Sequence, residues 1–221
     1  MSICDLEDKF DTFSFDDKLL ELKRKITKEN IDQLMIEYNK EILPKYIKTK
    51  IMTEVNLKGF LFEDILNKIK TDIMYASYFS KSALKQNIAE KLQFQYLTNK
   101  YPNLKKLPSN GPNSFFLSNK GIVKKRPEKG TKSIDFYDPD NKTFYYAKYI
   151  NENGGSQDNQ FIDVKTFVEL SNIFCRKDNT FKFILLIDGK YFNDKKKEIL
   201  NDMIDIKNIY NIYVKTSQLN F

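Results

Sequence analysis

Residues 133–150 read SIDFYDPDNKTFYYAKYI. Ser133–Asp138 and Thr143–Ile150 are rich in aromatic and β-branched residues, and the PDNK between them has the composition of a turn. This pattern predicts a β-hairpin. Asp135 lies on the first strand and Lys148 on the second, so we expect both side chains near one end of the two strands.

After the hairpin the sequence alternates helical and strand patterns. We expect a helix at Ser156–Phe174, a strand buried on both faces at Phe181–Ile187, a helix at Asp194–Ile204 and a last strand at Ile209–Val214. A helix at Ser82–Tyr101, with Ser80 or Ser82 as its N-cap, precedes the hairpin. The order predicts an α/β fold with a central mixed β-sheet flanked by helices.

The N-terminal third has a different pattern. From Asp17 to Phe79 apolar residues recur at intervals of three and four, which predicts amphipathic helices interrupted at Pro44 and Gly59, with Phe60–Phe79 as one helix. We therefore divide the chain into a helical N-terminal extension, residues 1–80, and an α/β core, residues 81–221.

Composition excludes several classes of protein. The 221 residues are 41% hydrophobic and 14% aromatic, which is typical of a globular protein. There is no run of about 18 apolar residues, and the N-terminal MSICDLEDKFD is acidic, so we expect a soluble cytoplasmic protein. The absence of histidine excludes Ser-His-Asp and Cys-His hydrolases and His-ligated zinc, and the two cysteines are too few for a Cys4 zinc site.

The net charge is +7, but only three of the 37 basic residues, Arg24, Arg126 and Arg176, are arginine. Such lysine-rich composition is typical of AT-rich genomes, so the charge permits a polyanionic partner without identifying one. Short strands are expected at Ser114–Leu117 and Gly121–Lys125. Lys124, Lys125 and Arg126 belong to a basic run in this segment, which forms either a solvated loop or a loop that contacts phosphates.

Asp135 and Lys148 suggest a chemistry that needs no histidine. A carboxylate beside a lysine can hold a divalent metal through oxygen and orient a water molecule. These are the requirements of phosphodiester hydrolysis. An ordinary ion pair between two strands is the structural alternative.

The strand with Asp135, the short turn and the strand that ends in Tyr146-Ala147-Lys148 resemble the PD-(D/E)XK nuclease superfamily. Within it, the run AKYINENGGSQDNQF (Ala147–Phe161) is similar to type II restriction endonucleases. The later FKFILLIDGKYF, helix and IYNIYV agree with that order, and the resemblance covers residues 82–215. One residue departs from it, because Tyr146 stands where the superfamily has an acid.

The resemblance implies a restriction-endonuclease-like sheet and Mg²⁺-dependent hydrolysis of double-stranded DNA at a short sequence. Asp135 would bind Mg²⁺ and Lys148 would position the attacking water. Glu90, Glu152 or Asp158 would supply the second carboxylate, and we favour Glu90. Helix-start residues Ser156, Gln157 and Asn159 would contact DNA or cap the helix.

The resemblance also implies a homodimer and a cognate methyltransferase in the same system. The helical extension would form the dimer contact or clamp DNA. Two other classes remain open at this point. One is a catalytically weak or silent nucleic-acid-binding protein of the same fold, which the residue at Tyr146 suggests, and the other is a structural or interaction protein.

Overall fold

The computed structural model describes residues 15–38, 40–83, 87–128, 131–150, 155–178 and 180–204, without the side chains of residues 155 and 156. The expected strand at Ile209–Val214 lies outside this range. The chain forms two compact units. We call Asp17–Ile88 the helical unit, and the described residues from Ala89 onward, together with Phe15 and Asp16, the sheet unit.

The helical unit is built from helices, as the apolar spacing predicted. Its elements are α1 (Phe15–Asp32), a π-helical turn η2 (Gln33–Glu37), α2 (Lys45–Lys58), α3 (Phe62–Thr71) and α4 (Ile73–Phe79). Pro44 precedes α2, and Gly59 ends it with a left-handed φ of 71° that a residue without a Cβ adopts readily. The core is mainly aliphatic, with buried Leu34, Ile47, Ile51, Ile69 and Phe79.

The expected single helix at Phe60–Phe79 is wrong, because the chain breaks at Asp72. This residue has extended backbone angles, and its side chain accepts hydrogen bonds from the backbone N–H groups of Met74 and Tyr75 at 2.9 and 3.1 Å. A short acidic side chain that caps a new helix offers the backbone an alternative to helix continuation. Apolar spacing alone does not detect such a cap, because apolar residues recur on both sides of Asp72, and three of those after it, Ile73, Met74 and Tyr78, are exposed.

The start of the next helix also differs from the prediction. Helix α5 runs over Ile88–Lys100, so neither Ser80 nor Ser82 is its N-cap. Ser80 instead follows α4, where its backbone N–H donates to the carbonyl of Ala76 at 2.9 Å. Serine favours helix ends generally, and the sequence does not distinguish the end of one helix from the start of the next.

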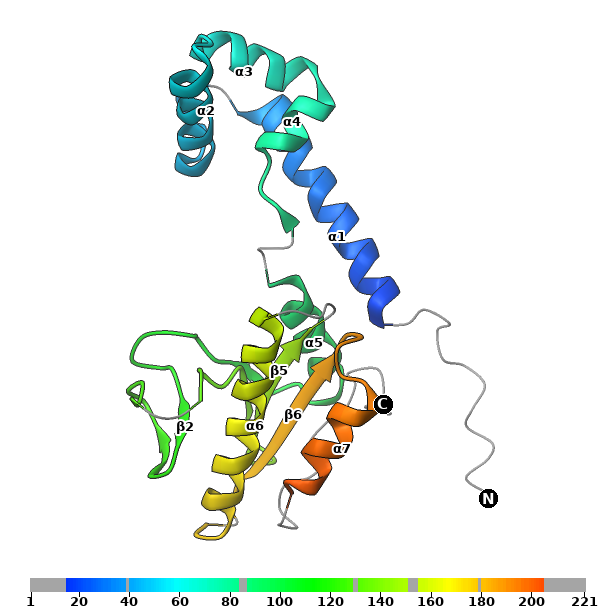
Figure 1. The fold of residues 1–221 in the computed structure, drawn as a ribbon, viewed down its shortest axis with the longest axis vertical. Coiled ribbons are helices and arrows are strands. Elements are labelled where there is room, and N and C mark those ends of the chain that lie inside the picture. The colour runs from blue at the N-terminus through cyan, green and yellow to red at the C-terminus, as the bar shows by residue number, and fades with distance from the viewer. Residues whose placement is uncertain are drawn as a thin grey trace, which may run out of the picture. The chain divides into compact units, whose positions relative to one another are not determined.

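A mixed four-stranded sheet forms the centre of the sheet unit (Figure 1). The strand order is β1 (Lys105–Lys106), β4 (Phe136–Asp138), β5 (Thr143–Tyr149) and β6 (Lys182–Asp188). The β1–β4 and β4–β5 pairs are antiparallel, and β6 runs parallel to β5, with Lys148 beside Ile187. The expected hairpin and mixed sheet are confirmed. The first hairpin strand is shorter than predicted, because ladder pairing begins only at Phe136.

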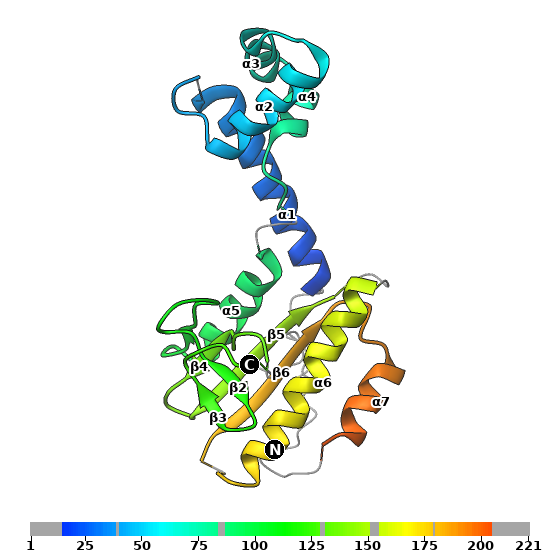
Figure 2. The ribbon, with the colours of Figure 1, turned by 60° about the vertical axis from the view of Figure 1, so that its left-hand side comes forward.

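Helices cover both faces of the sheet (Figures 1 and 2). Helices α6 (Gly155–Cys175) and α7 (Asp194–Asp202) pack on the face that carries Phe144, Tyr146 and Leu185. Helix α5 packs on the other face through Leu97, against Tyr145 and neighbouring residues. Alternation along β5 and β6 therefore supplies two separate cores. None of the described helices is long and apolar enough to span a membrane.

A separate hairpin lies beside the sheet. Strands β2 (Phe116–Ser118) and β3 (Gly121–Val123) pair antiparallel, and their ends lie within two residues of the predicted bounds. Strand β1 was not predicted. It consists of two exposed lysines, and such a pair carries no apolar alternation from which a strand is recognised.

Candidate active site

Asp135 lies immediately before β4 and is held by its own backbone. Its N–H donates to the carbonyl of Tyr145 at 3.1 Å, and its carbonyl accepts from the N–H of Leu107 at 2.8 Å. The carboxylate accepts a hydrogen bond from the backbone N–H of Ala147 at 2.7 Å. The Asp135 carboxyl is therefore fixed over β5, next to the residue that precedes Lys148.

The charges around Asp135 identify its neighbours. Burial raises the pKa of Asp135 from 3.8 to about 6, and the charge of Lys148 and the N–H of Ala147 oppose this increase. The charge of Glu90 raises the pKa further, and that of Lys106 lowers it. A carboxyl whose pKa is shifted by burial and by specific charged partners is typical of functional sites.

Glu90 reaches this group of charges from α5. Its carboxylate forms an ion pair with the ammonium group of Lys106 on β1, with a distance of 2.7 Å between Oε1 and Nζ. Of the residues predicted from the sequence, Lys148 and Glu90 thus both lie within electrostatic reach of Asp135. The arrangement contains two carboxylates and two ammonium groups, drawn from α5, β1, β5 and the residue before β4.

Tyr146 is the residue at which the sequence departs from the superfamily that it resembles, which has an acid there. Its side chain is fully buried, and its ring stacks on that of Phe167 with 4.8 Å between centroids. The Lys148 ammonium lies 4.1 Å from the centroid of the Tyr146 ring. Burial raises the pKa of Tyr146, and the charges of Asp163 and Asp135 raise it further, so the phenol is neutral at pH 7. Tyr146 therefore supplies packing and a π face, and not an anionic ligand.

Asp163 on α6 also faces Tyr146, and the sequence analysis did not select it. Its carboxylate pairs with the ammonium of Lys132 at 2.6 Å, and its charge acts on the Tyr146 hydroxyl. That hydroxyl has no hydrogen-bond partner among the described residues. Asp163 thus adds a carboxylate, besides those of Asp135 and Glu90, on the side of the hairpin that α6 covers.

Asp158, a predicted alternative to Glu90, has a different partner. Its carboxylate accepts a hydrogen bond from the Tyr191 hydroxyl at 2.5 Å. Its charge is not among those that shift the pKa of Asp135. The structure thus pairs Asp158 with the segment after β6. Glu152, the other alternative, and the side chain of Ser156 lie outside the described residues.

A buried contact fixes α5 against the end of the parallel strands. The side-chain amide of Gln93 donates to the carboxylate of Asp188 at 2.6 Å. The same amide lies 3.5 Å from the carbonyl of Lys148. Because Glu90 is three residues before Gln93, this contact positions the helix turn that carries Glu90 beside the hairpin. Gln93 is a positioning residue that the sequence analysis missed.

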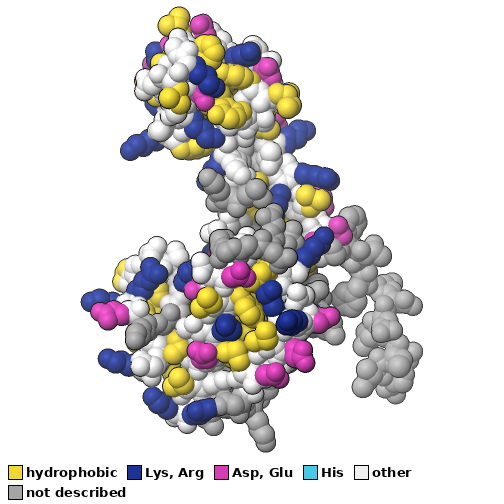
Figure 3. Space-filling model, viewed as in Figure 1, with side chains coloured by type: hydrophobic (Ala, Val, Ile, Leu, Met, Phe, Trp, Pro, Cys, Tyr) yellow, Lys and Arg dark blue, Asp and Glu magenta, His cyan; other side chains and the backbone are white. Residues whose placement is uncertain are grey.

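The predicted DNA-contacting residues lie in two places. Lys124, Lys125 and Arg126 follow β3 and are exposed. Lys125 and Arg126, with Lys120, line a hollow of about 440 Å³ whose acidic lining residue, among those described, is Glu128. Gln157 and Asn159 lie in the first turns of α6, where Asn159 is exposed and Gln157 is partly buried. Lysine and arginine side chains are distributed over both units on the face shown in Figure 3, so net charge alone marks no interface.

The carboxylates near Asp135 provide only some of the oxygen ligands that a Mg²⁺ ion needs. Among the described residues no three Asp, Glu or Cys side chains gather closely enough to hold a metal ion. Asp135 and Glu90 are the carboxylates that could bind one, and Mg²⁺ commonly uses one or two protein carboxylates together with water and phosphate oxygens. The carboxyl oxygens at Asp135 and Glu90 are thus compatible with Mg²⁺ in the presence of a phosphate-bearing substrate.

Comparisons of the chain with protein-family models, curated proteins and solved structures find no match.

The two missed charged residues, Lys106 and Asp163, differ in the signal that the sequence offered. Lys106 is one lysine among many, and only the pairing of β1 with β4 places it near Asp135. Asp163 occupies a helix whose boundaries were well predicted. A helical projection of α6 against the expected face of Tyr146 could have placed the Asp163 side chain toward the hairpin.

Proposed function

We propose that this protein is a Mg²⁺-dependent endonuclease that hydrolyses phosphodiester bonds in double-stranded DNA, of the type II restriction class. One observation carries the proposal: the charges of Lys148, Glu90 and Lys106 all act on the Asp135 carboxyl, and Glu90 pairs with Lys106, at the open end of a β-hairpin. The element order α5, β1, β4, β5, α6 and β6 resembles the restriction-endonuclease-like arrangement and supports the same function.

In this proposal Asp135 and Glu90 would hold Mg²⁺. The ion, when bound, lowers the pKa of water and neutralises phosphate charge. The N–H of Ala147 keeps the Asp135 carboxylate in place, and the Lys106 ammonium holds that of Glu90. Lys148 orients the attacking water and stabilises negative charge that develops on the phosphate. The Lys148 ammonium lies over the Tyr146 ring. This contact limits the conformations of the lysine side chain and leaves its positive charge unneutralised.

DNA would meet this site through the basic loop after β3. Lys125 and Arg126 surround a hollow with Lys120, and a phosphate group fits such a lining by charge. The start of α6, with Gln157 and Asn159, presents amides that donate and accept hydrogen bonds. A homodimer is the expected assembly, because a two-fold protein matches a palindromic site and cuts both strands.

A second candidate function is DNA binding without cleavage. The observation that favours it is the buried Tyr146, which stands where the superfamily that the sequence resembles has an acid. Among the described residues, no three Asp, Glu or Cys side chains gather to hold a metal ion. The two functions predict the same affinity for DNA and differ in the need for a divalent metal.

Cleavage of plasmid and phage DNA, with Mg²⁺ or with EDTA, tests the proposal. We expect cutting with Mg²⁺ only. Lys148→Ala should reduce cleavage by at least about 10²-fold while DNA binding is retained, which is the scale of a lost charge-stabilising or proton-transfer group. Asp135→Asn should abolish cleavage, and Glu90→Gln should reduce it more than about 10-fold.

Matched controls are available on the same elements. Lys105→Ala removes an exposed lysine from β1, and Glu169→Gln removes an exposed carboxylate from α6. Both should cleave like the wild type. Asp163→Asn tests the competing carboxylate, and if it is inactive while Glu90→Gln cleaves normally, the ligand assignment is wrong. DNA binding without metal-dependent cutting would favour the second candidate function, and full activity in EDTA would exclude the mechanism.

A further inference from the structure

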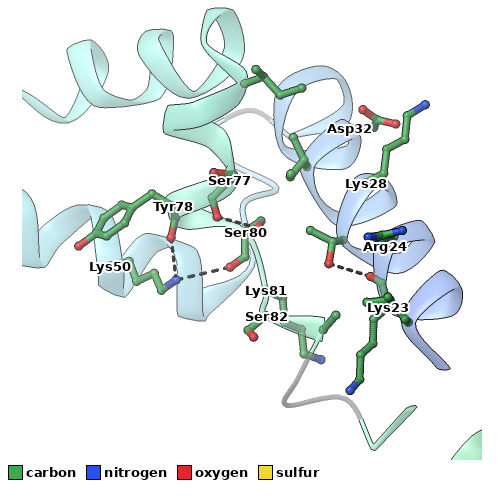
Figure 4. A pocket seen from close by; sticks show the side chains of 15 residues that line it. Lys23, Arg24, Lys28, Asp32, Lys50, Ser77, Tyr78, Ser80, Lys81 and Ser82 are labelled. Atoms are coloured by element: carbon green, nitrogen blue, oxygen red, sulfur yellow. Dashed lines mark hydrogen bonds between the residues drawn. The ribbon is translucent and has the colours of Figure 1, made fainter. Parts of the chain in front are cut away.

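The helical unit contains a groove of about 750 Å³, and none of the residues that line it is among those proposed for catalysis. Its walls come from α1, from Lys50 on α2, from α4 and from residues 80–83 (Figure 4). All of its lining residues belong to the helical unit. A volume of this size is within the usual range of ligand-binding pockets, about 300–1,000 Å³.

Hydrogen bonds hold the walls of the groove together. The Lys50 ammonium lies 3.2, 3.4 and 3.5 Å from the carbonyl oxygens of Tyr78, Phe79 and Ser80, at the C-terminal end of α4. A cation at this end of a helix satisfies carbonyls that lack an intrahelical partner. The side-chain amide of Asn30 on α1 donates to the carbonyl of Lys81 at 2.9 Å. The groove walls are thus fixed to one another by hydrogen bonds, and Lys50 has a structural role in them.

The remaining charge of the groove is strongly positive. Arg24, Lys28 and Lys81 line it with exposed side chains, and within the described part of the chain none of them forms an ion pair. Lys23 adds a fourth cation beside them, and the acidic residue that lines the groove among those described is Asp32. This surface is complementary to an anion.

The arrangement of the cations favours a polyanion over a single phosphate group. Lys23, Arg24 and Lys28 follow one another along α1 and do not converge on one point (Figure 4). Arg24 and Lys28 are separated by about 6 Å along the helix axis, at 1.5 Å per residue. A linear polymer with repeated charges matches such a row better than a small anion does.

The uncharged lining indicates which part of a nucleic acid is recognised. The aromatic residue among the described lining residues is Tyr78, and its ring points away from α1 (Figure 4). No ring therefore faces the α1 cations to stack on a base, which is the usual means of base recognition in single-strand binding grooves. Leu20 and Ile73 are exposed in the groove and could contact apolar sugar faces.

We propose that this groove binds the sugar-phosphate backbone of a DNA strand without regard to sequence. The choice of DNA as the polyanion rests on the proposed function, whereas the groove, its cations and its lack of an inward aromatic ring do not. The helical unit thereby anchors the substrate and contributes affinity, and sequence selection falls to the other unit.

The test is a salt titration of DNA binding by the full chain in EDTA, measured by fluorescence anisotropy. The groove variant is Arg24→Ala/Lys28→Ala/Lys81→Ala. The control variant, Lys25→Ala/Lys45→Ala/Lys70→Ala, removes the same charge from the same unit at positions outside the groove. Each lost phosphate contact lowers the slope of log K against log salt by about 0.9, so the groove variant should lose roughly 2–3 in slope and at least about tenfold in affinity.

The loss should be equal for DNA fragments of unrelated sequence, and the control variant should bind nearly like the wild type. Equal binding by the groove and control variants would overturn the inference, and so would a loss confined to one DNA sequence or a wild type that binds no DNA. The outcome is separable from the proposed function, because binding is measured without metal. A chain that binds DNA through the groove but never cleaves it would refute only the nuclease proposal.

Discussion

At the scale of single residues, the Asp135 carboxyl is partly buried and feels the charge of Lys148, but also the negative charge of Glu90. Burial and Glu90 together outweigh Lys148, Lys106 and the N–H of Ala147, since the pKa of Asp135 stays at about 6. At neutral pH the group is ionised at the expense of folding free energy. Such local destabilisation is common where a site is arranged for chemistry and not for stability.

Asp135→Asn should therefore stabilise the metal-free protein at neutral pH. Between pH 3.8 and about 6 the folded protein binds more protons at Asp135 than the unfolded chain does, so the free energy of unfolding falls as pH rises through this window. The neutral amide avoids this loss. We expect the variant to be more stable by about 1–3 kcal/mol at pH 8 and equal to the wild type below pH ~4.

Urea denaturation in EDTA at several pH values measures this difference. Asp140→Asn is the matched control, because Asp140 is an exposed turn residue that accepts a hydrogen bond from the Asn103 side chain. It should show no comparable pH-dependent gain. An Asp135→Asn variant that is less stable than the wild type at pH 8 would mean that the ionised carboxylate supports the fold.

At the scale of elements, the ends of β5 and β6 are joined by a close backbone contact. Gly189 follows β6 with a positive φ of 96°, and a Cβ at this position would overlap the carbonyl oxygen of Ile150. That same carbonyl accepts a hydrogen bond from the N–H of Tyr191, and the N–H of Ile150 donates a hydrogen bond to the carbonyl of Asp188. Glycine here permits the strand end, and with it Lys148 and Asp188, to be held together.

Gly189→Ala should destabilise the sheet unit by about 3 kcal/mol or more, because it adds a backbone overlap to an unfavourable φ. Gly111→Ala is the matched control: Gly111 has the same φ of 96°, but nothing lies within 4 Å of an added Cβ. The control should lose only the conformational part, about 1–2 kcal/mol. Thermal unfolding followed by circular dichroism distinguishes them, and equal losses would show that the contact with Ile150 relaxes easily.

Element patterns and element contacts differed in how well the sequence predicted them. The alternation in Thr143–Ile150 and the apolar run before Asp188 predicted β5 and β6 to within one residue. This is possible because the burial of a strand appears directly in the sequence as a pattern of apolar residues. Asp135, Lys148 and Glu90 were selected from the sequence, and in the structure the charges of Lys148 and Glu90 act on the Asp135 carboxyl. Lys106 and Asp163 were missed, because their place depends on strand pairing and helix rotation, which no short-range pattern encodes.

At the scale of the whole molecule, exposed hydrophobic side chains concentrate in the helical unit. Among the described residues, most of the large exposed hydrophobic side chains belong to Asp17–Ile88, and Ile162 and Ile199 are those of the sheet unit. Leu57 and Leu61 lie on either side of the turn at Gly59, with exposed fractions of 76% and 68%. Hydrophobic side chains are visible on this unit among lysines in Figure 3. Exposed apolar patches of this kind commonly mark protein–protein contacts.

We therefore expect the predicted homodimer to form through the α2–α3 turn. Leu57→Gln/Leu61→Gln should raise the dimer dissociation constant at least about tenfold, because the apolar area removed from water on association is lost. Sedimentation velocity over a concentration series measures it, with Ile162→Gln/Ile199→Gln as the control from the other unit. Neither leucine lines the groove proposed to bind DNA, so affinity for short DNA should persist. A wild type that stays monomeric at all concentrations would refute the homodimer, and an unchanged dimer in the leucine variant would place its contact elsewhere.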